Sequence, residues 1–204
     1  MSSIDSLSTL FMKFPGIGTR QAKRFVYFLL TQNPRFLEEL SLEIGNLRRN
    51  ISQCSSCYRF YQKNGSTQTV CSICSGDHDE SILLVVEKDT DLESVKKSGS
   101  YAGKYFVLGG TIPVLEADPA SRIRIRELMA RIQSGAPLGL SEVILALSAN
   151  PEGDFTREYV AKVLDPIVKD LNITVTTLGR GLSTGTELEY SDGDTLKHAL
   201  KNRG

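Results

Sequence analysis

Apolar residues change their spacing along this chain, and the change divides it into two parts. In the N-terminal part they recur every three or four positions, which is the period of one face of an α-helix. Further along, runs of four or five consecutive apolar residues alternate with helical stretches. Such runs are typical of strands that are buried on both faces of a parallel sheet. The pattern therefore predicts an α/β fold with an α-helical N-terminal part.

Two helices are predicted at the N-terminus, over residues 6–13 and 19–30, and the turn 14–18 (Phe-Pro-Gly-Ile-Gly) separates them. In the second helix the apolar side chains fall on one stripe, formed by Ala22, Phe25, Val26 and Leu29. Thr19 is expected to cap this helix. The turn is expected to be too tight for a Cβ at either of its glycines.

A third helix is predicted from Asn33, which caps it, with Pro34 in its first turn. Its apolar residues recur at three and four positions and form a seam: Leu37, Leu40, Ile44, Leu47 and Ile51. Such a seam suits packing on a neighbouring helix, either of the same chain or of a second copy. Packing within one chain is the more common of these outcomes, and self-association is the alternative.

The rest of the chain predicts strands that alternate with helices. The strands are expected over residues 81–87, 105–108, 142–147 and 173–177. The helices are expected over residues 88–98, 118–134, 155–170 and 194–201. Gly99 fits the end of the first of these helices, and Asp118-Pro119 fits the start of the second. This alternation predicts a parallel α/β sheet.

The four cysteines of the chain form two pairs, Cys54 with Cys57 and Cys71 with Cys74. Each pair has a two-residue spacer, and thirteen residues separate the pairs. This spacing lets four thiolates converge on one tetrahedral ion and leaves no position for a catalytic water. The sequence therefore predicts a structural zinc site. Disulfide bonds are the alternative, which a reducing compartment disfavours, and His78 is expected to be a solvated loop residue.

Basic residues are concentrated in the N-terminal part, although the whole chain is neutral. Residues 1–60 contain eight Lys or Arg and four Asp or Glu, so a polyanion is expected to bind there. Gly16 and Gly18 leave backbone N–H groups open at the start of the second helix, where the helix dipole also favours an anion. With Arg20, Lys23 and Arg24 behind it, we interpret the turn as a helix-hairpin-helix that grips a DNA phosphate without reading a base. A plain helix connector is the alternative.

Acidic residues follow two of the predicted strands. Glu87 closes the first strand, and Glu152 and Asp154 follow the third. Ligands of open parallel sheets bind at the carboxyl ends of the strands, and carboxylate oxygens suit Mg²⁺. A magnesium site is one interpretation. In the other, Asp154 caps the helix that begins at Phe155, and Glu152 lies in a solvated turn.

Several other functions find no support in the sequence. There is no Gly-x-x-x-x-Gly-Lys phosphate loop, no cysteine outside the two pairs, and only two histidines. No apolar run approaches the roughly 20 residues that a membrane span needs, and the N-terminus has no signal-peptide pattern. A cytoplasmic protein is therefore expected.

The chain as a whole resembles the RecR family of bacterial recombination mediators. The motifs that carry the resemblance run in order along it: Phe14-Pro-Gly-Ile-Gly18 with Arg20 and Arg24; Cys54, Cys57, Cys71 and Cys74; Val85-Val-Glu87; Val107-Leu-Gly-Gly110; Glu152-Gly-Asp154 with Thr156; Arg180-Gly-Leu182; and Leu188-Glu-Tyr-x-Asp192. The chain departs from the family pattern in a longer loop between the cysteine pairs, in an altered segment 111–118, and in Asn150-Pro151 standing directly before Glu152.

The resemblance implies four parts. They are a helix-hairpin-helix domain over residues 1–53, a four-cysteine zinc finger over 54–78, a Toprim domain over 79–178 and a C-terminal segment over 179–204. The resemblance also implies a non-enzymatic homo-oligomer, a dimer or a tetrameric ring, that clamps DNA without sequence specificity. Such a protein acts with RecO and RecF to place RecA on single-stranded DNA coated by single-strand-binding protein.

Three functions compete at this point. Toprim domains also occur in nucleases, topoisomerases and primases that use Mg²⁺, so a magnesium-dependent nuclease is the alternative to the mediator. We expect instead that Glu87, Glu152 and Asp154 form a partner-docking surface at which Mg²⁺ is optional, because no motif places a tyrosine nucleophile. A zinc-bearing adaptor that never touches DNA is the third hypothesis.

Overall fold

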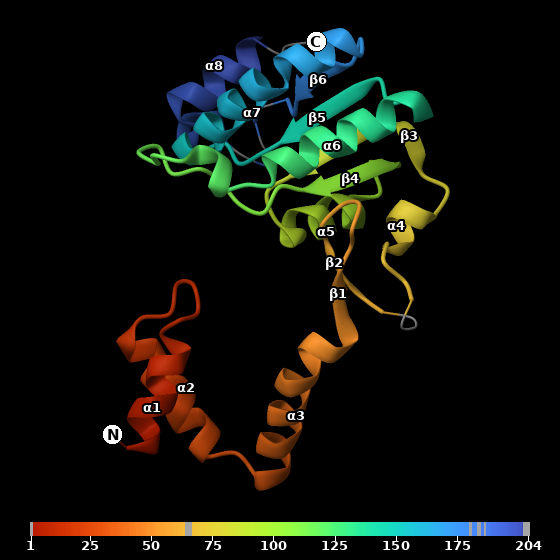
Figure 1. The fold of residues 1–204 in the computed structure, drawn as a ribbon. Coiled ribbons are helices and arrows are strands. Elements are labelled where there is room, and N and C mark those ends of the chain that lie inside the picture. Colours follow the sequence, from red (N-terminus) through yellow and green to blue (C-terminus); the bar gives the residue numbers. More distant parts are fainter. Residues whose placement is uncertain (1, 64–66, 180, 183–184, 186, 202–204) are drawn as a thin grey trace. The chain divides into compact units, whose positions relative to one another are not determined.

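The chain folds into two compact units, Met1–Ile51 and Ser52–Gly204 (Figure 1). The computed structural model describes residues 2–63, 67–179, 181–182, 185 and 187–201. Arg180, which belongs to the predicted C-terminal motif, lies outside these residues. No helix within the described ranges is long and apolar enough to cross a membrane.

The first unit contains the helices α1 (Ser3–Phe11), α2 (Thr19–Leu30) and α3 (Pro34–Asn50). Helix α1 begins earlier than predicted because Ser2 and Asp5 form a capping box, in which the Asp5 N–H donates to Ser2 Oγ at 3.2 Å. Asn33 caps α3 as predicted, and its side-chain oxygen accepts a hydrogen bond from the Phe36 N–H at 2.8 Å.

Helices α1 and α2 pack on each other through a small set of side chains. Ala22 and Val26 of α2 are buried. The rings of Phe11 and Phe25 meet edge to face, with centroids 5.7 Å apart. The predicted apolar stripe on α2 is therefore confirmed at its centre.

Helix α3 does not bury its apolar seam. It contains no buried residue. The exposed fractions of Leu37, Leu40, Ile44 and Leu47 are 38%, 36%, 62% and 59%. The other helices of the first unit therefore do not cover this seam, in contrast to the prediction of packing on a neighbouring helix of the same unit.

The second unit is built on a four-stranded parallel sheet in the order β4-β3-β5-β6 (Figure 1). The strands are β3 (Asp79–Val86), β4 (Gly103–Val107), β5 (Glu142–Ala146) and β6 (Thr174–Thr177). In the middle of the sheet, Leu84 of β3 is paired with Tyr105 of β4 on one side and with Ile144 of β5 on the other. The predicted α/β fold with a parallel sheet is confirmed.

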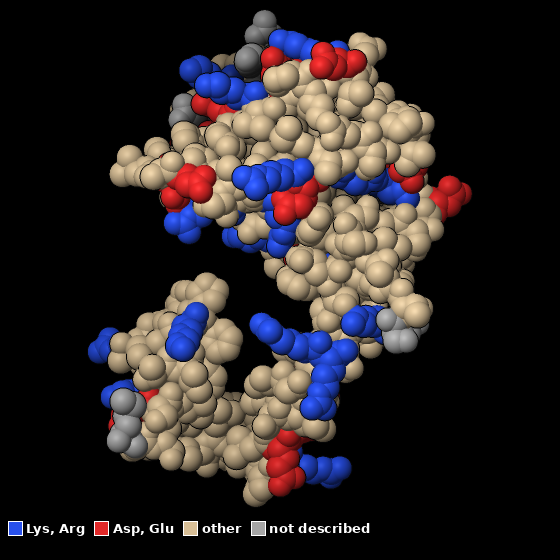
Figure 2. All heavy atoms as spheres, in the orientation of Figure 1, with Lys and Arg blue, Asp and Glu red and all other residues tan. Residues whose placement is uncertain are grey.

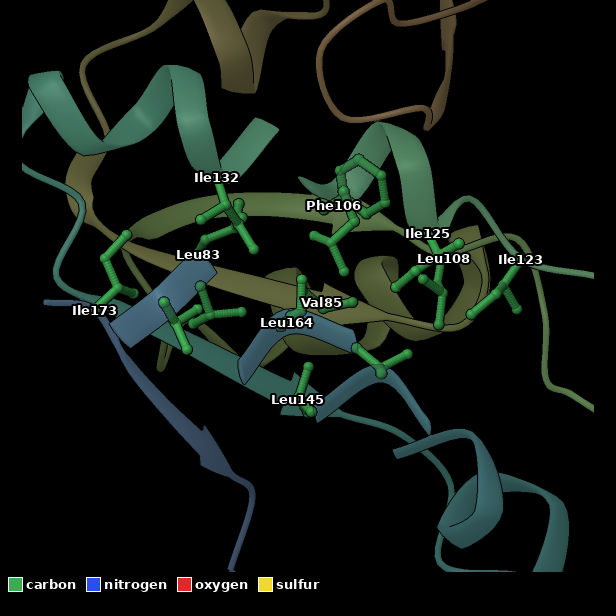
Figure 3. Packing of buried hydrophobic residues seen from close by; sticks show 14 of the residues in the cluster. Leu83, Val85, Phe106, Leu108, Ile123, Ile125, Ile132, Leu145, Leu164 and Ile173 are labelled. Carbon is green, nitrogen blue, oxygen red and sulfur yellow. The ribbon is translucent and has the colours of Figure 1, made fainter. Parts of the chain in front are cut away.

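Helices cover both faces of this sheet. They are α5 (Asp89–Ser98), α6 (Ile125–Gly135) and α7 (Pro151–Asp170). Leu83, Val85 and Phe106 pack with Ile132 of α6 and Leu164 of α7 on one face (Figure 3). The neighbouring residues along the strands, such as Leu84 and Tyr105, lie on the other face with α5, as the alternation of side chains in a strand requires.

In the second unit, α6 and α7 begin several residues away from the predicted positions. Asp118 starts only a 3₁₀ turn, η1 (Pro119–Ser121), and makes no side-chain cap, while α6 begins after Arg124. Helix α7 begins at Pro151 instead of Phe155, because Asn150 Oδ1 accepts a hydrogen bond from the Gly153 N–H at 2.7 Å. The helix α5 ends as predicted at Gly99, whose φ of 67° lies in the left-handed region.

Short elements complete the second unit. The strands β1 (Ile51–Gln53) and β2 (Phe60–Gln62) form a two-stranded sheet beside the first cysteine pair, and the one-turn helix α4 (Ser72–Ser75) contains the last cysteine. The 3₁₀ turn η2 (Ala136–Leu138) follows α6. Towards the C-terminus lie η3 (Leu188–Tyr190) and α8 (Gly193–Lys201).

Candidate metal centre, nucleic-acid interface and acidic edge

The four cysteines come together as predicted. Their sulfur atoms all lie within 4.8 Å of one another. The Sγ atoms of Cys54 and Cys74 are 3.8 Å apart, and those of Cys57 and Cys71 are 3.6 Å apart. A tetrahedron with metal–sulfur bonds of about 2.3 Å has edges of about 3.8 Å, so the spacing of the sulfurs fits a four-coordinate ion. His78 is not part of this group, and it is half-buried instead of solvated.

The four sulfurs cannot all carry a negative charge without a cation between them. Contact with Cys57 lowers the pKa of the Cys54 thiol, whereas contact with Cys54 raises the pKa of the Cys57 thiol. Contact with Cys54 also raises the pKa of Cys74. A bound cation stabilises the ionised form of every sulfur, so this donor set suits a thiophilic metal ion.

The turn between α1 and α2 leaves the start of α2 without a side-chain cap. Gly16 has a φ of 77°, a conformation that side chains with a Cβ disfavour. Gly18 is the N-cap of α2 and provides no side-chain hydrogen bond, in contrast to Ser2 of α1 and Asn33 of α3. The first N–H groups of α2 therefore lack a side-chain acceptor, and N–H groups at a helix start favour an anion.

Two details of this turn differ from the predictions. Thr19 is the first residue of α2, and its hydroxyl contacts Met12 Sδ at 3.5 Å instead of capping the helix. A Cβ at Gly16 or Gly18 would meet no atom within 4 Å, so the turn is not sterically tight. Glycine is required at position 16 by its φ, whereas at position 18 it keeps the helix start open to a ligand.

Basic side chains surround this turn. Arg20, Lys23 and Arg24 are exposed. None of the three forms an ion pair with a described carboxylate. Figure 2 shows Lys and Arg side chains over the α1–α2 hairpin. The arrangement offers positive charge and backbone donors of the kind that bind phosphates.

The acidic residues lie at the carboxyl edge of the sheet but do not form a metal cluster. Glu87 is 3% exposed, and its two oxygens accept hydrogen bonds from the Ser148 N–H at 2.5 Å and the Ser148 hydroxyl at 3.0 Å. Within the described part of the chain, the cysteines form the one group of three or more candidate ligands. The magnesium site therefore stays a prediction, with Glu87 already engaged by the loop after β5.

Glu152 and Asp154 occupy the first turn of α7. Glu152 is exposed and accepts a hydrogen bond from the Thr111 hydroxyl at 3.3 Å, while Asp154 pairs with Arg157 at 2.7 Å. Asp154 is not the N-cap, because Asn150 holds that position. Acids in the first turn are favoured by the helix dipole, so their position also has a structural reason.

Two residues that shape this edge, Gly153 and Thr156, belong to the quoted motif Glu152-Gly-Asp154 with Thr156, but no role was predicted for either of them. A Cβ at Gly153 would lie 2.1 Å from the Ser148 carbonyl oxygen, so only glycine allows the loop to fold back there. Thr156 is buried, and its hydroxyl accepts a hydrogen bond from the Ile112 N–H at 2.8 Å and donates to the Glu152 carbonyl at 2.6 Å. The contact between Ile112 and Thr156 joins segments 44 residues apart in the sequence, so only the folded chain shows it.

Comparison with known proteins agrees with this arrangement. Residues 81–178 match the Toprim domain, and residues 181–203 match the family described as RecR, C-terminal. Recombination protein RecR of Amoebophilus asiaticus is 37% identical over 202 residues, which cover 98% of this chain and 93% of that protein. Recombination protein RecR of Chlorobium chlorochromatii is 35% identical over 202 residues, covering 98% and 96%.

Proposed function

Because the chain belongs to the RecR family of recombination proteins, we propose that it is a DNA-binding mediator that holds backbone phosphates at the turn between α1 and α2. The observation that carries this proposal is the uncapped start of α2 behind Gly16 and Gly18. A phosphate there would accept hydrogen bonds from the free N–H groups and would face Arg20, Lys23 and Arg24. Binding of this kind is independent of base sequence.

A charge-reversal experiment tests the proposed phosphate binding at this turn. Replacing Arg20 and Lys23 together with Glu is expected to weaken binding to all DNA sequences alike. If both residues contact phosphates, the negative slope of log K against log salt becomes shallower by about two. The matched control replaces Lys97 and Lys162, two exposed lysines of the second unit, with Glu, and it is expected to keep the slope. Unchanged affinity of the first variant would move the site elsewhere, for example to the segment 122–131.

We propose that the ion held by the four cysteines is a structural Zn²⁺. Four sulfurs at tetrahedral spacing fill its coordination shell, and three of the four cysteines are fully buried. Elemental analysis is expected to find one zinc per chain. A protein that folds and holds no metal at these thiols would contradict the assignment.

We also propose that the chain is a homo-oligomer, a dimer or a tetrameric ring, and that the α3 seam is one of its contacts. The seam exposes leucine and isoleucine along one face of the helix, which a second helix can cover. Replacing Ile44 and Leu47 with Glu is expected to lower the mass measured by light scattering. Leu42, which is 61% exposed and lies off the seam, is the control position for the same substitution.

The partners proposed for the acidic edge are proteins of the RecO and RecF type, which would act with this chain to place RecA on single-stranded DNA. Glu152 is exposed at the start of α7 and is available to a basic partner surface. Glu152→Lys is expected to weaken partner binding in titration calorimetry, whereas Glu158→Lys, at another exposed position of α7, is expected to leave it unchanged. Equal effects of both changes would exclude Glu152 as a specific contact.

We propose that the protein is not catalytic. Among the described residues, Glu87, Glu152 and Asp154 do not come together as a group of candidate metal ligands, which supports this proposal. Labelled single- and double-stranded DNA incubated with the protein and Mg²⁺ or Mn²⁺ is expected to stay intact. Cleavage that Glu87→Ala abolishes would favour the alternative, a magnesium-dependent nuclease.

A further inference from the structure

A buried lysine joins the second cysteine pair to the sheet. Lys104 lies in β4 and is 2% exposed. Its Nζ atom donates hydrogen bonds to the carbonyl oxygens of Ile73, Cys74 and Gly76 at 3.2, 3.3 and 3.0 Å. It also lies 3.0 Å from Glu80 Oε1. An ammonium group away from water needs such a set of partners, because an unpaired buried charge is strongly unfavourable.

The partners of Lys104 are themselves groups that need a donor. Ile73 and Cys74 belong to the one-turn helix α4, and Gly76 directly follows it. Carbonyls at the end of a helix have no partner within the helix, and the helix dipole places negative potential there. The ammonium therefore satisfies the end of the segment that carries Cys71 and Cys74.

The two cysteine pairs are attached to the sheet unit in different ways. Around the first pair, the Val107 N–H donates to the Cys57 carbonyl at 2.8 Å, the Phe60 N–H donates to Asp89 at 2.7 Å, and Arg59 pairs with Glu93 at 2.6 Å. For residues 71–76, the hydrogen bonds to the strands that the structure describes all come from Lys104. The first pair has several polar attachments. The second has one, the Lys104 ammonium, beside the apolar packing of the buried Ile73 against Tyr105 and Val107 of β4.

This attachment also covers the edge strand of the sheet, β4. Strand β4 is at the end of the strand order, and all five of its residues are nevertheless buried. The Val107–Cys57 hydrogen bond and the Lys104 contacts place the cysteine module over this strand. An uncovered edge strand presents free N–H and C=O groups to other chains, so the module protects the sheet from pairing at this edge.

We propose that Lys104 is a positioning residue for the metal centre, which holds the second cysteine pair on β4 so that metal retention and the closure of this sheet edge depend on each other. The inference rests on the proposed zinc site. The metal links the second pair to the firmly attached first pair, and Lys104 links the second pair to the sheet. Loss of the metal leaves the segment 71–76 attached to the sheet alone, and loss of the ammonium leaves the packing of Ile73 as its contact with β4.

The first experiment compares Lys104→Met, Lys104→Arg and the control Lys162→Met, an exposed lysine on α7. Zinc transfer to a colorimetric chelator is expected to be about tenfold faster for Lys104→Met, in the range seen when outer contacts of metal ligands are removed. Lys104→Arg, which keeps the charge and the donors, is expected to fall between that variant and wild type. Zinc release from folded Lys104→Met at the wild-type rate would overturn the inference. Absence of zinc from the wild-type protein would instead overturn the zinc assignment.

The second experiment needs no variant, and so it remains decisive if Lys104→Met does not fold. Hydrogen exchange is measured on the wild-type protein before and after the metal is stripped by a chelator. Stripping is expected to increase exchange in residues 103–107 of β4 and to leave residues 142–146 of β5, in the sheet interior, protected. Protection of β4 that is unchanged after stripping would overturn the dependence between metal and sheet edge.

Discussion

The two units of the chain differ in how much of their apolar surface they cover. In the second unit Phe106, Leu128 and Leu164 are completely buried between the sheet and its helices. In the first unit, Ala22 and Val26 are the buried apolar residues among those described, while Ile44 and Leu47 are more than half exposed. The sheet has a complete core, whereas the helical unit has an exposed apolar face.

This difference shows what apolar periodicity does and does not predict. The seam of α3 and the runs in β3 and β4 are equally clear in the sequence. The strands are buried by helices of the same chain, but the seam is not. A periodic pattern therefore identifies the face that is to be covered, and the structure is needed to tell what covers it.

A pair of leucine-to-alanine substitutions tests the contrast directly. Leu164→Ala removes a completely buried side chain and is expected to cost about 2–5 kcal/mol of the free energy of unfolding. Leu47→Ala, at 59% exposure, is expected to change it by less than about 0.5 kcal/mol when the protein is dilute enough to be monomeric. Urea unfolding monitored by circular dichroism measures both. Similar costs at the two positions would show that α3 is covered within the monomer.

The polar contact between α7 and the segment before η1 gives a smaller expected effect. Thr156→Val keeps the shape of the side chain but removes the acceptor of the buried Ile112 N–H, at an expected cost of about 1–3 kcal/mol. Thr176→Val, at a half-buried hydroxyl that donates to Glu142 at 2.6 Å, is expected to cost less because water can reach that site. The midpoints of urea unfolding compare the two, and an equal loss would argue against a special role for Thr156.

Much of this architecture could be predicted from the sequence because its causes are local. Continuous apolar runs predict three of the four strands, the β-branched stretch 173–177 predicts the fourth, and the spacing of the cysteines predicts their convergence. The starts of α6 and α7 could not be predicted in the same way. Asp118 and Asp154 are good capping residues by type, but the chain places its helix starts at Arg124 and Asn150. Several acceptable caps compete there, and tertiary contacts decide between them.

The residues that the sequence did not reveal act across long separations. Lys104 meets carbonyls about thirty positions earlier in the chain, and Ser148 meets Glu87 across 61 positions. A lysine beside a strand is usually an exposed residue, so nothing in its sequence context indicates burial. The pattern of apolar residues specifies the layers, while contacts of this kind appear only when the layers are assembled.

The glycine at the tip of the α1–α2 turn sharpens the contrast within the helical unit. Gly16→Ala places a Cβ on a residue with a φ of 77°. The free energy of opening α2, measured by hydrogen exchange, is therefore expected to fall by about 1 kcal/mol. Gly45→Ala, in the middle of α3 with open space around its Cβ, is expected to gain about 0.5–1 kcal/mol, because alanine favours a helix. Hydrogen exchange of the helix amides measures the loss expected for Gly16→Ala and the gain expected for Gly45→Ala. A gain at Gly16 would show that the turn is not held at positive φ.

The smallest effect on stability is expected at Gly18, and it separates folding from function. Gly18→Ser gives α2 a side-chain cap, which is expected to stabilise the helix by a few tenths of a kcal/mol. The serine oxygen then occupies an N–H group that we propose for a phosphate, so DNA binding is expected to weaken while stability rises. Gly18→Ala is the control, because it adds a Cβ without a cap and is expected to weaken binding less. Fluorescence anisotropy with labelled DNA reads the affinity of each variant. If the serine variant is more stable and binds DNA as the wild type does, the open start of α2 is not the phosphate site, and its missing cap needs another explanation.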